Sequence, residues 1–325
     1  MGTLKNLKSG YLTTMADETK AKYTLGYEFE IPYLEMGGPS AETKKALAEA
    51  GYPAGHHDSG GWEVGSPVHG RLDVARSYAK RLMAAIEGDA NLEPDNVQLG
   101  NCGIHVHTMV NDPKFKYQPK EFETYSKVER LLNRGVPYNS AYRMVRSDNW
   151  KRTEELHYIL QATFNRAEAT DFIKGSSHRF LDPSSSTYKT NATPNKWDTR
   201  VDSEMTSLLQ QDMANRSMIR TNTPKVVTDN TIEFRIWKGV QNRLIPAIEF
   251  GHAAIRWGHK VYKEMPDADK RRLAEMYLLP DMTVSAREKA HRDANDIAPR
   301  LRDFFDWVGG QKGYSNLKGE IECHA

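Results

Sequence analysis

Two carboxylates separated by one aromatic residue stand out early in the chain. Glu28 and Glu30 lie in the segment Gly26–Glu30, which reads GYEFE. Because successive side chains of a β-strand point to opposite faces, a strand here places both carboxylates on one face and the aromatic rings on the other. Such a pair most often lies on a solvated sheet face, so it indicates a site only together with other polar residues.

Three further short segments also place polar side chains on an apolar strand. Each leaves one apolar face for a hydrophobic core and one face of carboxylate, imidazole or guanidinium groups. His-x-His on a strand is a common spacing of metal ligands, whereas Glu-x-Arg more often forms a cross-strand ion pair. The polar residues are Glu63, with Asp58 shortly before it; His105 and His107 in Gly103–His107; and Glu233 and Arg235 in Thr231–Trp237.

Four such strands in one sheet form a concave wall of carboxylates, imidazoles and a guanidinium. Carboxylates packed together repel one another and resist the loss of water, and a divalent cation relieves both effects. Oxygen ligands suit Mg²⁺ or Mn²⁺, and an imidazole among them favours tolerance of Mn²⁺. Arginine suits an anionic ligand such as phosphate, because its planar fork binds two oxygens at once. The sequence therefore predicts a metal-dependent site that also holds an anion.

The elements that must position these residues are strands interspersed with helices. Their order lacks regular strand–helix alternation, which favours an α+β fold with a curved, largely antiparallel sheet and helices on one side of it. Ser40 predicts the start of a short helix that ends at Gly51, and 55–61 is expected to be a loop. Alternation predicts strands at 23–32, 62–66, 97–110 and 231–237. Helices are predicted at 72–86, 119–135, 150–174 and from Ile245 onward, with breaks at Pro266, Pro280 and Pro299. Residues 175–200 are predicted to form a long loop.

Composition narrows the class of protein. The chain has 325 residues, with 45 basic and 43 acidic side chains and a formal net charge of +2. So small a charge gives no sign of a nucleic-acid-binding patch. No segment approaches the roughly 20 apolar residues of a membrane span, and the N-terminus lacks the apolar run of a signal peptide. Since Cys102 and Cys323 are its only cysteines, we expect reduced thiols and a cytoplasmic protein.

Taken in order, the four motifs resemble the glutamine synthetase superfamily of carboxylate–amine ligases. More closely they are similar to its bacterial and phage amidoligase branch. That branch is marked by Gly-x-Glu-x-Glu, a Glu followed by Ser-Pro, Gly-x-His-Val-His and Thr-x-Glu-Phe-Arg. The corresponding segments here are Gly26–Glu30, Glu63–Pro67, Gly103–His107 and Thr231–Arg235.

The resemblance covers roughly residues 23–250 and implies three parts of the chain. A polar N-terminal arm occupies 1–21, a glutamine synthetase-like catalytic domain 22–250, and a helical C-terminal extension packed on that domain 251–325. For a phage-encoded protein the expected compartment is the host cytoplasm. The sequence leaves the oligomeric state open.

The resemblance also implies an activity. The protein is expected to use ATP and two or more Mg²⁺ or Mn²⁺ ions to join a carboxylate to an amine through an acyl phosphate. The product is an amide or peptide bond, and the substrates are small molecules or peptides. No Gly-rich phosphate loop of the Walker type is present, so the nucleotide site must be built from the sheet.

Residue roles follow from the resemblance, motif by motif. Glu28, His105 and Glu233 are expected to bind the metal that bridges the ATP phosphates, and Glu30 and Glu63 a second metal near the acceptor carboxylate. The family has a further carboxylate at that second metal, for which the sequence offers only Asp58. The remaining expected roles are Arg235 neutralising the transferred phosphoryl group, Arg216 or Arg220 holding substrate or phosphate, and His107 orienting the carboxylate substrate.

Two other functions fit the same residues. A metal-dependent hydrolase can use a wall of carboxylates and imidazoles without ATP. A binding or structural protein can keep the fold without turnover. Amide formation coupled to ATP consumption separates the ligase from both.

Overall fold

The computed structural model divides the chain into two compact units. The first comprises residues 1–111, 234–255 and 312–325, and the second comprises 112–233 and 256–311. Of the helices in the described part of the chain, none has the length and apolar character that a membrane crossing requires. The described residues are 20–31, 38–52, 55–58, 61–89, 91, 103–115, 134, 148–164, 219–221, 231–238, 243–277, 293 and 296–324.

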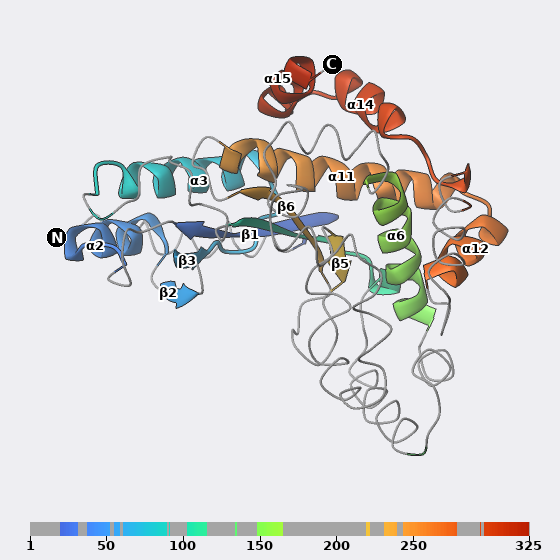
Figure 1. Cartoon of the computed structure of the whole chain (residues 1–325), viewed down its shortest axis with the longest axis horizontal. Coiled ribbons are helices and arrows are strands. Elements are labelled where there is room, and N and C mark those ends of the chain that lie inside the picture. Colours follow the sequence, from blue (N-terminus) through green and yellow to red (C-terminus); the bar gives the residue numbers. More distant parts are fainter. Residues whose placement is uncertain are drawn as a thin grey trace, which may run out of the picture. The chain divides into compact units, whose positions relative to one another are not determined.

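Five strands of a six-stranded sheet form the centre of the first unit (Figure 1). These five follow the order β2-β3-β1-β4-β6, and β1 pairs antiparallel with both β3 and β4, as β2 does with β3. The four predicted strands are therefore present and belong to one sheet. Their bounds are β1 Tyr23–Ile31, β2 Gly55–Asp58, β3 Gly61–Gly65, β4 Gly103–Val110 and β6 Ile232–Lys238.

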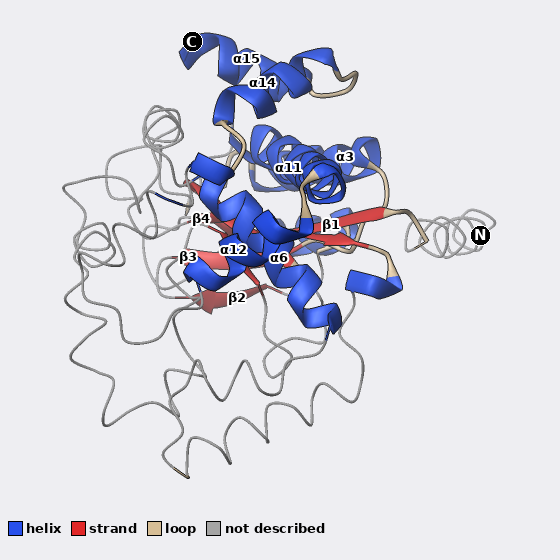
Figure 2. Cartoon of the chain, turned by 90° about the vertical axis from the view of Figure 1, so that its right-hand side faces the viewer, coloured by secondary structure: helices blue, strands red, loops and turns tan. Residues whose placement is uncertain are grey.

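Helices cover one face of this sheet. Figures 1 and 2 place α3 (Leu72–Ile86) and the start of α11 (Leu244–Glu264) on the same side of the strands. A Cβ on Gly251 of α11 would lie 2.5 Å from the Val106 Cγ1 atom of β4, so this helix approaches the strand at a point where only glycine fits. Phe234 of β6 meets Phe250 of α11 edge-on, with ring centroids 5.8 Å apart.

The alternation of β1 explains why that face is apolar. Leu25, Tyr27, Phe29 and Ile31 are buried on the helix side. Burying one such side chain stabilises the fold by about 1.5–3 kcal/mol, so the odd positions of β1 fix which face receives the helices. Glu28 and Glu30 therefore lie on the opposite face.

The short helix predicted after Ser40 is present as α2 (Ala41–Ala50). The Ser40 hydroxyl accepts a hydrogen bond from the Thr43 N–H at 3.1 Å, which satisfies one of the free donors at the helix start. Gly51 ends the helix with a φ of 100°, a conformation that glycine adopts without strain.

The prediction of a loop at 55–61 is wrong. Residues Gly55–Asp58 form the edge strand β2, which pairs with β3 from Gly55 opposite Val64 to Asp58 opposite Gly61. Glycine, histidine and aspartate have weak strand preferences, so local composition pointed to a loop. The hydrogen bonds of the ladder with β3 outweigh that preference.

The second unit is mainly helical in its described part. Its core brings together Phe164, Trp257 and Phe304, whose ring centroids lie 5.1–6.2 Å apart. Gly258 of α11 packs against Leu160, where a Cβ would lie 2.6 Å from the leucine Cδ2 atom. The unit contains η2 Pro113–Phe115, α6 Asp148–Phe164, β5 Ile219–Thr221, α12 Asp267–Tyr277, α14 Leu301–Gly310 and the end of α11.

The helical C-terminal part is confirmed. Helix α11 ends at Glu264 just before Pro266, and α14 begins after Pro299, so two of the predicted proline breaks separate helices. A last helix, α15 (Ser315–His324), belongs to the first unit. Four predictions lie outside the described residues: the helix at 119–135 apart from residue 134, the end of the helix at 150–174, the loop at 175–200 and the break at Pro280.

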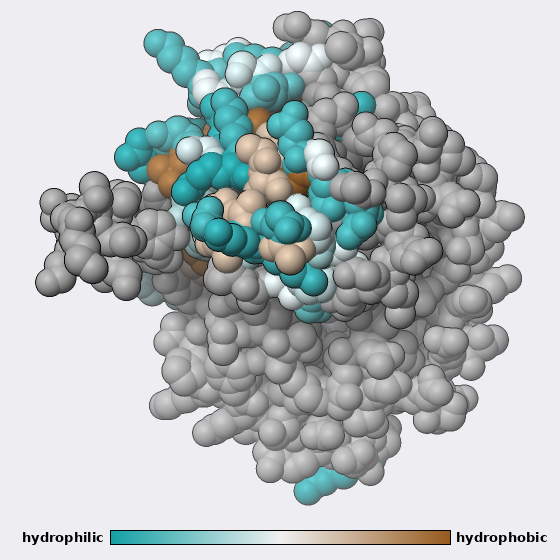
Figure 3. Space-filling model, turned by 90° about the vertical axis from the view of Figure 1, so that its left-hand side faces the viewer, coloured by the Kyte–Doolittle hydropathy of each residue, from teal (hydrophilic) through white to brown (hydrophobic). Residues whose placement is uncertain are grey.

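Hydrophilic side chains cover most of the described surface visible in Figure 3, with apolar residues appearing in the gaps between them. Among the described residues, Val68 is the exposed large apolar side chain, with 48% of its surface accessible. A single exposed valine is no apolar docking patch.

Candidate functional site

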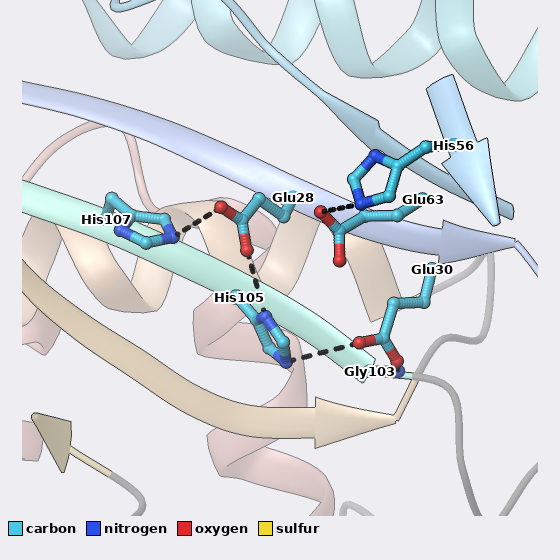
Figure 4. Close-up of polar contacts among 7 residues, drawn as sticks. All are labelled: Glu28, Glu30, His56, Glu63, Gly103, His105 and His107. Carbon is cyan, nitrogen blue, oxygen red and sulfur yellow. Dashed lines mark hydrogen bonds and ion pairs between the residues drawn. The ribbon is translucent and has the colours of Figure 1, made fainter. Parts of the chain in front are cut away.

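Strand register brings the polar residues of three motifs onto one face of the sheet. Glu28 of β1 lies directly opposite His105 of β4, and Glu30 lies directly opposite Glu63 of β3. Directly opposite residues of an antiparallel pair share a face, with Cβ atoms about 4.5–5.5 Å apart. His107 follows His105 by two residues and shares that face. Figure 4 shows these side chains pointing toward one another.

Glu28 bridges the two imidazoles of β4. Its Oε2 atom lies 3.1 Å from His105 Nδ1, and its Oε1 atom lies 3.2 Å from His107 Nε2. Burial disfavours the charge of Glu28, but the hydrogen bonds from His105 and His107 outweigh burial and lower the pKa of this carboxyl well below its usual range. Glu28 is therefore an anion at neutral pH.

Glu30 is held from two sides at the start of β4. Its Oε2 atom accepts a hydrogen bond from the Gly103 N–H, and its Oε1 atom lies 3.7 Å from His105 Nε2. A Cβ on Gly103 would lie 3.0 Å from His105 Nε2 and 3.5 Å from Glu30 Oε2. Glycine at 103 thus lets the backbone come close to both side chains, and the imidazole of His105 sits between two carboxylates.

Glu63 meets an imidazole that the sequence did not single out. His56 of β2 lies directly opposite Glu63, and its Nε2 atom is 3.7 Å from Glu63 Oε1. Sequence reasoning missed His56 because the segment 55–61 was expected to be a loop. The sequence carries only a weak signal here, the dipeptide Ser59-Gly60, which favours a turn.

Within single carboxylate–imidazole pairs, the donor atoms are as far apart as neighbouring ligands of a divalent cation. In an octahedral shell with metal–ligand distances of roughly 2.0–2.6 Å, neighbouring ligand atoms are about 2.8–3.7 Å apart. The carboxylate and imidazole atoms here are 3.1–3.7 Å apart. Carboxylate oxygens with imidazole nitrogens form a donor set suited to Mn²⁺ as well as to Mg²⁺.

Two other predicted site residues, Glu233 and Arg235, lie on β6. Glu233 is fully buried and is the last residue of the second unit before β6 continues into the first unit as Phe234. Arg235 is half-buried on β6, the strand next to β4. Their roles stay predictions. Arg216 and the side chains of Arg220 and Asp58 lie outside the described part of the structure.

Comparisons with known proteins add little. No protein-family model and no curated protein matches the chain. Among solved structures, it is similar to a bifunctional glutathione synthetase from Pasteurella multocida, with a TM-score of 0.38 and 10% sequence identity. The match covers 98% of this chain and 48% of that chain, so this chain spans about half the length of that protein. A likeness this distant says nothing of function.

Proposed function

We propose that this protein is an ATP- and Mg²⁺- or Mn²⁺-dependent carboxylate–amine ligase with a glutamine synthetase-like catalytic domain. One observation supports the proposal above all. Strand register gathers the polar residues of three motifs, each similar to an amidoligase motif, on the face of the sheet opposite α3 and the start of α11: Glu28, Glu30, Glu63, His105 and His107.

The carboxylates are the groups that would hold the cations. Glu28 with His105 supplies one set of donors, to which the sequence resemblance adds Glu233. Glu30 and Glu63 face each other across β1 and β3 and supply a second set. Bound there, a divalent cation neutralises phosphate oxygens and the charge that develops during phosphoryl transfer.

The proposed reaction forms no covalent bond to the protein. A substrate carboxylate oxygen bonds to the γ-phosphorus of ATP and ADP leaves with the electrons of the broken P–O bond. The amine nitrogen then bonds to the acyl carbon of this acyl phosphate, and inorganic phosphate leaves as the amine loses a proton. The side chains therefore act chiefly by positioning and by neutralising charge.

His107 and Arg235 take the two remaining roles. His107 lies 3.2 Å from Glu28, which orients its imidazole, and it would align the acceptor carboxylate. Arg235, on the strand beside β4, would face the phosphoryl oxygens with its planar fork, which binds two of them at once.

ATP turnover tests the proposal directly. The protein is incubated with Mg²⁺–ATP or Mn²⁺–ATP, a panel of carboxylates and a panel of amines, while ADP and amide products are measured. Hydroxylamine serves as one amine, because it traps an acyl phosphate as a hydroxamate. We expect ADP release that requires a carboxylate, with hydroxamate formed in equal amount, and on the order of 10²–10³-fold less of both from Glu28→Gln.

Two results would contradict the ligase. Cleavage of amides or esters by the metal-loaded protein without ATP would favour the hydrolase. Tight binding of Mg²⁺–ATP with no ADP release against the whole panel would favour a binding protein.

A further inference from the structure

Ser66 and Pro67 follow strand β3 directly and belong to one of the four sequence motifs, yet the site described so far gives them no role. The last residue of β3, Gly65, lies opposite Glu28 of β1. Ser66 continues the pairing by one step, because its backbone N–H donates to the Tyr27 carbonyl at 2.8 Å. Ser66 therefore contacts β1 at the residue next to Glu28.

The Ser66 hydroxyl takes the place of a backbone carbonyl in this ladder. In a regular antiparallel ladder, the two residues of a hydrogen-bonded pair exchange both backbone N–H···O bonds. Here the Tyr27 N–H donates instead to the Ser66 Oγ atom at 2.9 Å, and the same hydroxyl donates its proton to the Pro67 carbonyl at 2.9 Å. The bond to Pro67 fixes the direction of the hydroxyl proton and leaves a lone pair for the Tyr27 N–H.

This exchange of acceptor coincides with a β-bulge. Beyond it, Leu25 and His69 exchange backbone hydrogen bonds of 2.8 and 2.7 Å. Tyr27 and Leu25 are two residues apart, whereas Ser66 and His69 are three apart, so one extra residue interrupts the ladder. Pro67 lies at the interruption and has no N–H to donate. The Ser66 hydroxyl thus holds β1 at a point where backbone pairing is broken.

That point adjoins the contacts between Glu28 and the two imidazoles of β4. Tyr27 precedes Glu28, and Gly26 before it lies directly opposite His107. The Glu28 carboxylate oxygens are 3.1 Å from His105 and 3.2 Å from His107. Groups that bind a ligand together must be held to within about 0.5 Å of the productive geometry. A backbone shift at Tyr27 would move Glu28 relative to both histidines.

We propose that Ser66 is a positioning residue, whose hydroxyl fixes the backbone of β1 beside Glu28 so that this carboxylate can bind a cation together with its imidazole neighbours. The proposal rests on the cation site of the proposed ligase. Ser66 acts through Glu28 and contacts neither the cation nor a substrate. Groups that orient metal ligands typically raise metal affinity by about 10–100-fold.

A hydroxyl that only satisfies a backbone donor would stabilise the fold without affecting the cation. Ser40 is the matched control, because its hydroxyl accepts the Thr43 N–H at 3.1 Å at the start of α2, in the same unit. Ser40→Ala and Ser66→Ala each remove a hydroxyl from a hydrogen bond with a backbone N–H. Both variants should therefore lower the melting temperature by similar amounts.

Titration with Mn²⁺ alone separates the two roles without requiring turnover. Free Mn²⁺ is followed by its electron paramagnetic resonance signal as it is added to the full chain, and Glu28→Gln identifies the ion that depends on this carboxylate. Ser66→Ala should weaken binding of that ion about tenfold, whereas Ser40→Ala should leave it unchanged. Ser66→Thr keeps the hydroxyl and should bind Mn²⁺ as the wild type does.

A double variant tests whether Ser66 acts through Glu28. Adding Ser66→Ala to Glu28→Gln should weaken Mn²⁺ binding no further, because the carboxylate that Ser66 positions is already lost. Equal weakening by Ser66→Ala with and without that carboxylate would overturn the proposal. Equal weakening in Ser66→Ala and Ser40→Ala, or wild-type affinity in Ser66→Ala, would also overturn it.

The ligase function fails separately. The expected pattern of Mn²⁺ binding without carboxylate-dependent ADP release would keep Ser66 as a positioning residue and remove the ligase. Carboxylate-dependent ADP release with wild-type Mn²⁺ affinity in Ser66→Ala would keep the ligase and remove the role of Ser66.

Discussion

In the first unit, the buried carboxylate of Glu249 and the carboxylates on the sheet are neutralised in different ways. Glu249 of α11 is fully buried. A guanidinium, a side-chain amide and a backbone N–H surround its carboxylate. The Arg76 Nε atom lies 3.1 Å from its Oε1 atom, the Asn316 side-chain amide donates to Oε1 at 2.7 Å, and the Leu317 N–H donates to Oε2 at 2.8 Å. Nothing more is needed to satisfy this carboxylate.

The carboxylates on the sheet have imidazoles among their partners. Glu28 and Glu30 are paired with His105 and His107, which can release their protons, and Glu30 also faces Glu63. Like charges directly opposite each other are unfavourable. The fixed donors around Glu249 indicate a structural residue, whereas the imidazole partners and facing carboxylates of the sheet are the groups that the proposed function would use to hold a cation.

The structural role of Glu249 is to join three helices. Arg76 comes from α3, and Asn316 and Leu317 from the first turn of α15, so the carboxylate caps that helix from outside. Arg76 also donates to the Gly313 carbonyl, just ahead of α15. Within the first unit, the buried Glu249 carboxylate and the Arg76 guanidinium therefore link α15 to α3 and α11.

Removing Glu249 should have the largest effect on stability. Glu249→Ala leaves Arg76 without its counter-ion and opens the first turn of α15, so we expect the free energy of unfolding to fall by about 3–5 kcal/mol. Urea unfolding followed by circular dichroism measures it. A loss below about 1 kcal/mol would mean that Glu249 is no more structural than a surface carboxylate.

Glu28→Gln should affect turnover more than stability. His105 and His107 can lose their protons when the carboxylate goes, so no orphaned charge remains and stability should fall by clearly less than in Glu249→Ala. Turnover should fall on the order of 10²–10³-fold, because a ligand charge is lost from the site. Urea unfolding and ADP release are read on the same preparation. If stability falls as far as in Glu249→Ala, the comparison between the two groups fails.

Arg235→Lys tests whether this arginine takes part in turnover. Lysine keeps the positive charge and loses the planar fork, so turnover should fall on the order of 10²-fold while the fold and Mn²⁺ binding persist. Glu233→Gln is the contrasting variant, since it should weaken binding of metal and nucleotide. Unchanged turnover in Arg235→Lys, on a proven substrate, would remove this arginine from the mechanism.

A buried imidazole on the helix side of the sheet predicts a smaller, pH-dependent effect. His69 is buried against Tyr27 and Tyr78, and burial, followed by the nearby Arg81 charge, lowers its pKa to about 4. Between the unfolded value near 6.5 and about 4, the unfolded chain binds a proton that the folded chain does not. Stability therefore falls as pH drops through this window, by at most about 1.4 kcal/mol per pH unit.

His69→Phe should flatten this slope, as measured by urea unfolding between pH 4 and pH 7. The contribution of Glu28 falls in another window. Its folded pKa is lowered, so the stability that it contributes is present above its unfolded pKa and is lost at more acidic pH. A slope that persists between pH 5 and pH 7 in His69→Phe would assign the titration to another group.

The sequence by itself determined which side chains share a face of each strand. Alternation placed Glu28 with Glu30 and His105 with His107, and helical spacing gave α3 with its observed bounds, Leu72–Ile86. These features follow from local stereochemistry, because the two-residue period of a strand and the 3.6-residue period of a helix need no distant partner. Four strands and a polar face were therefore predictable.

Only the tertiary structure decided which residues of different strands meet. Register set Glu28 opposite His105, and the pairing of β2 with β3 brought in His56 from a segment without a strand pattern. Glu249 meets Asn316 and Leu317 across more than 60 positions of sequence. Such contacts depend on which strands pair and how the helices pack, and those choices are settled by the burial of the whole apolar face rather than by any local motif.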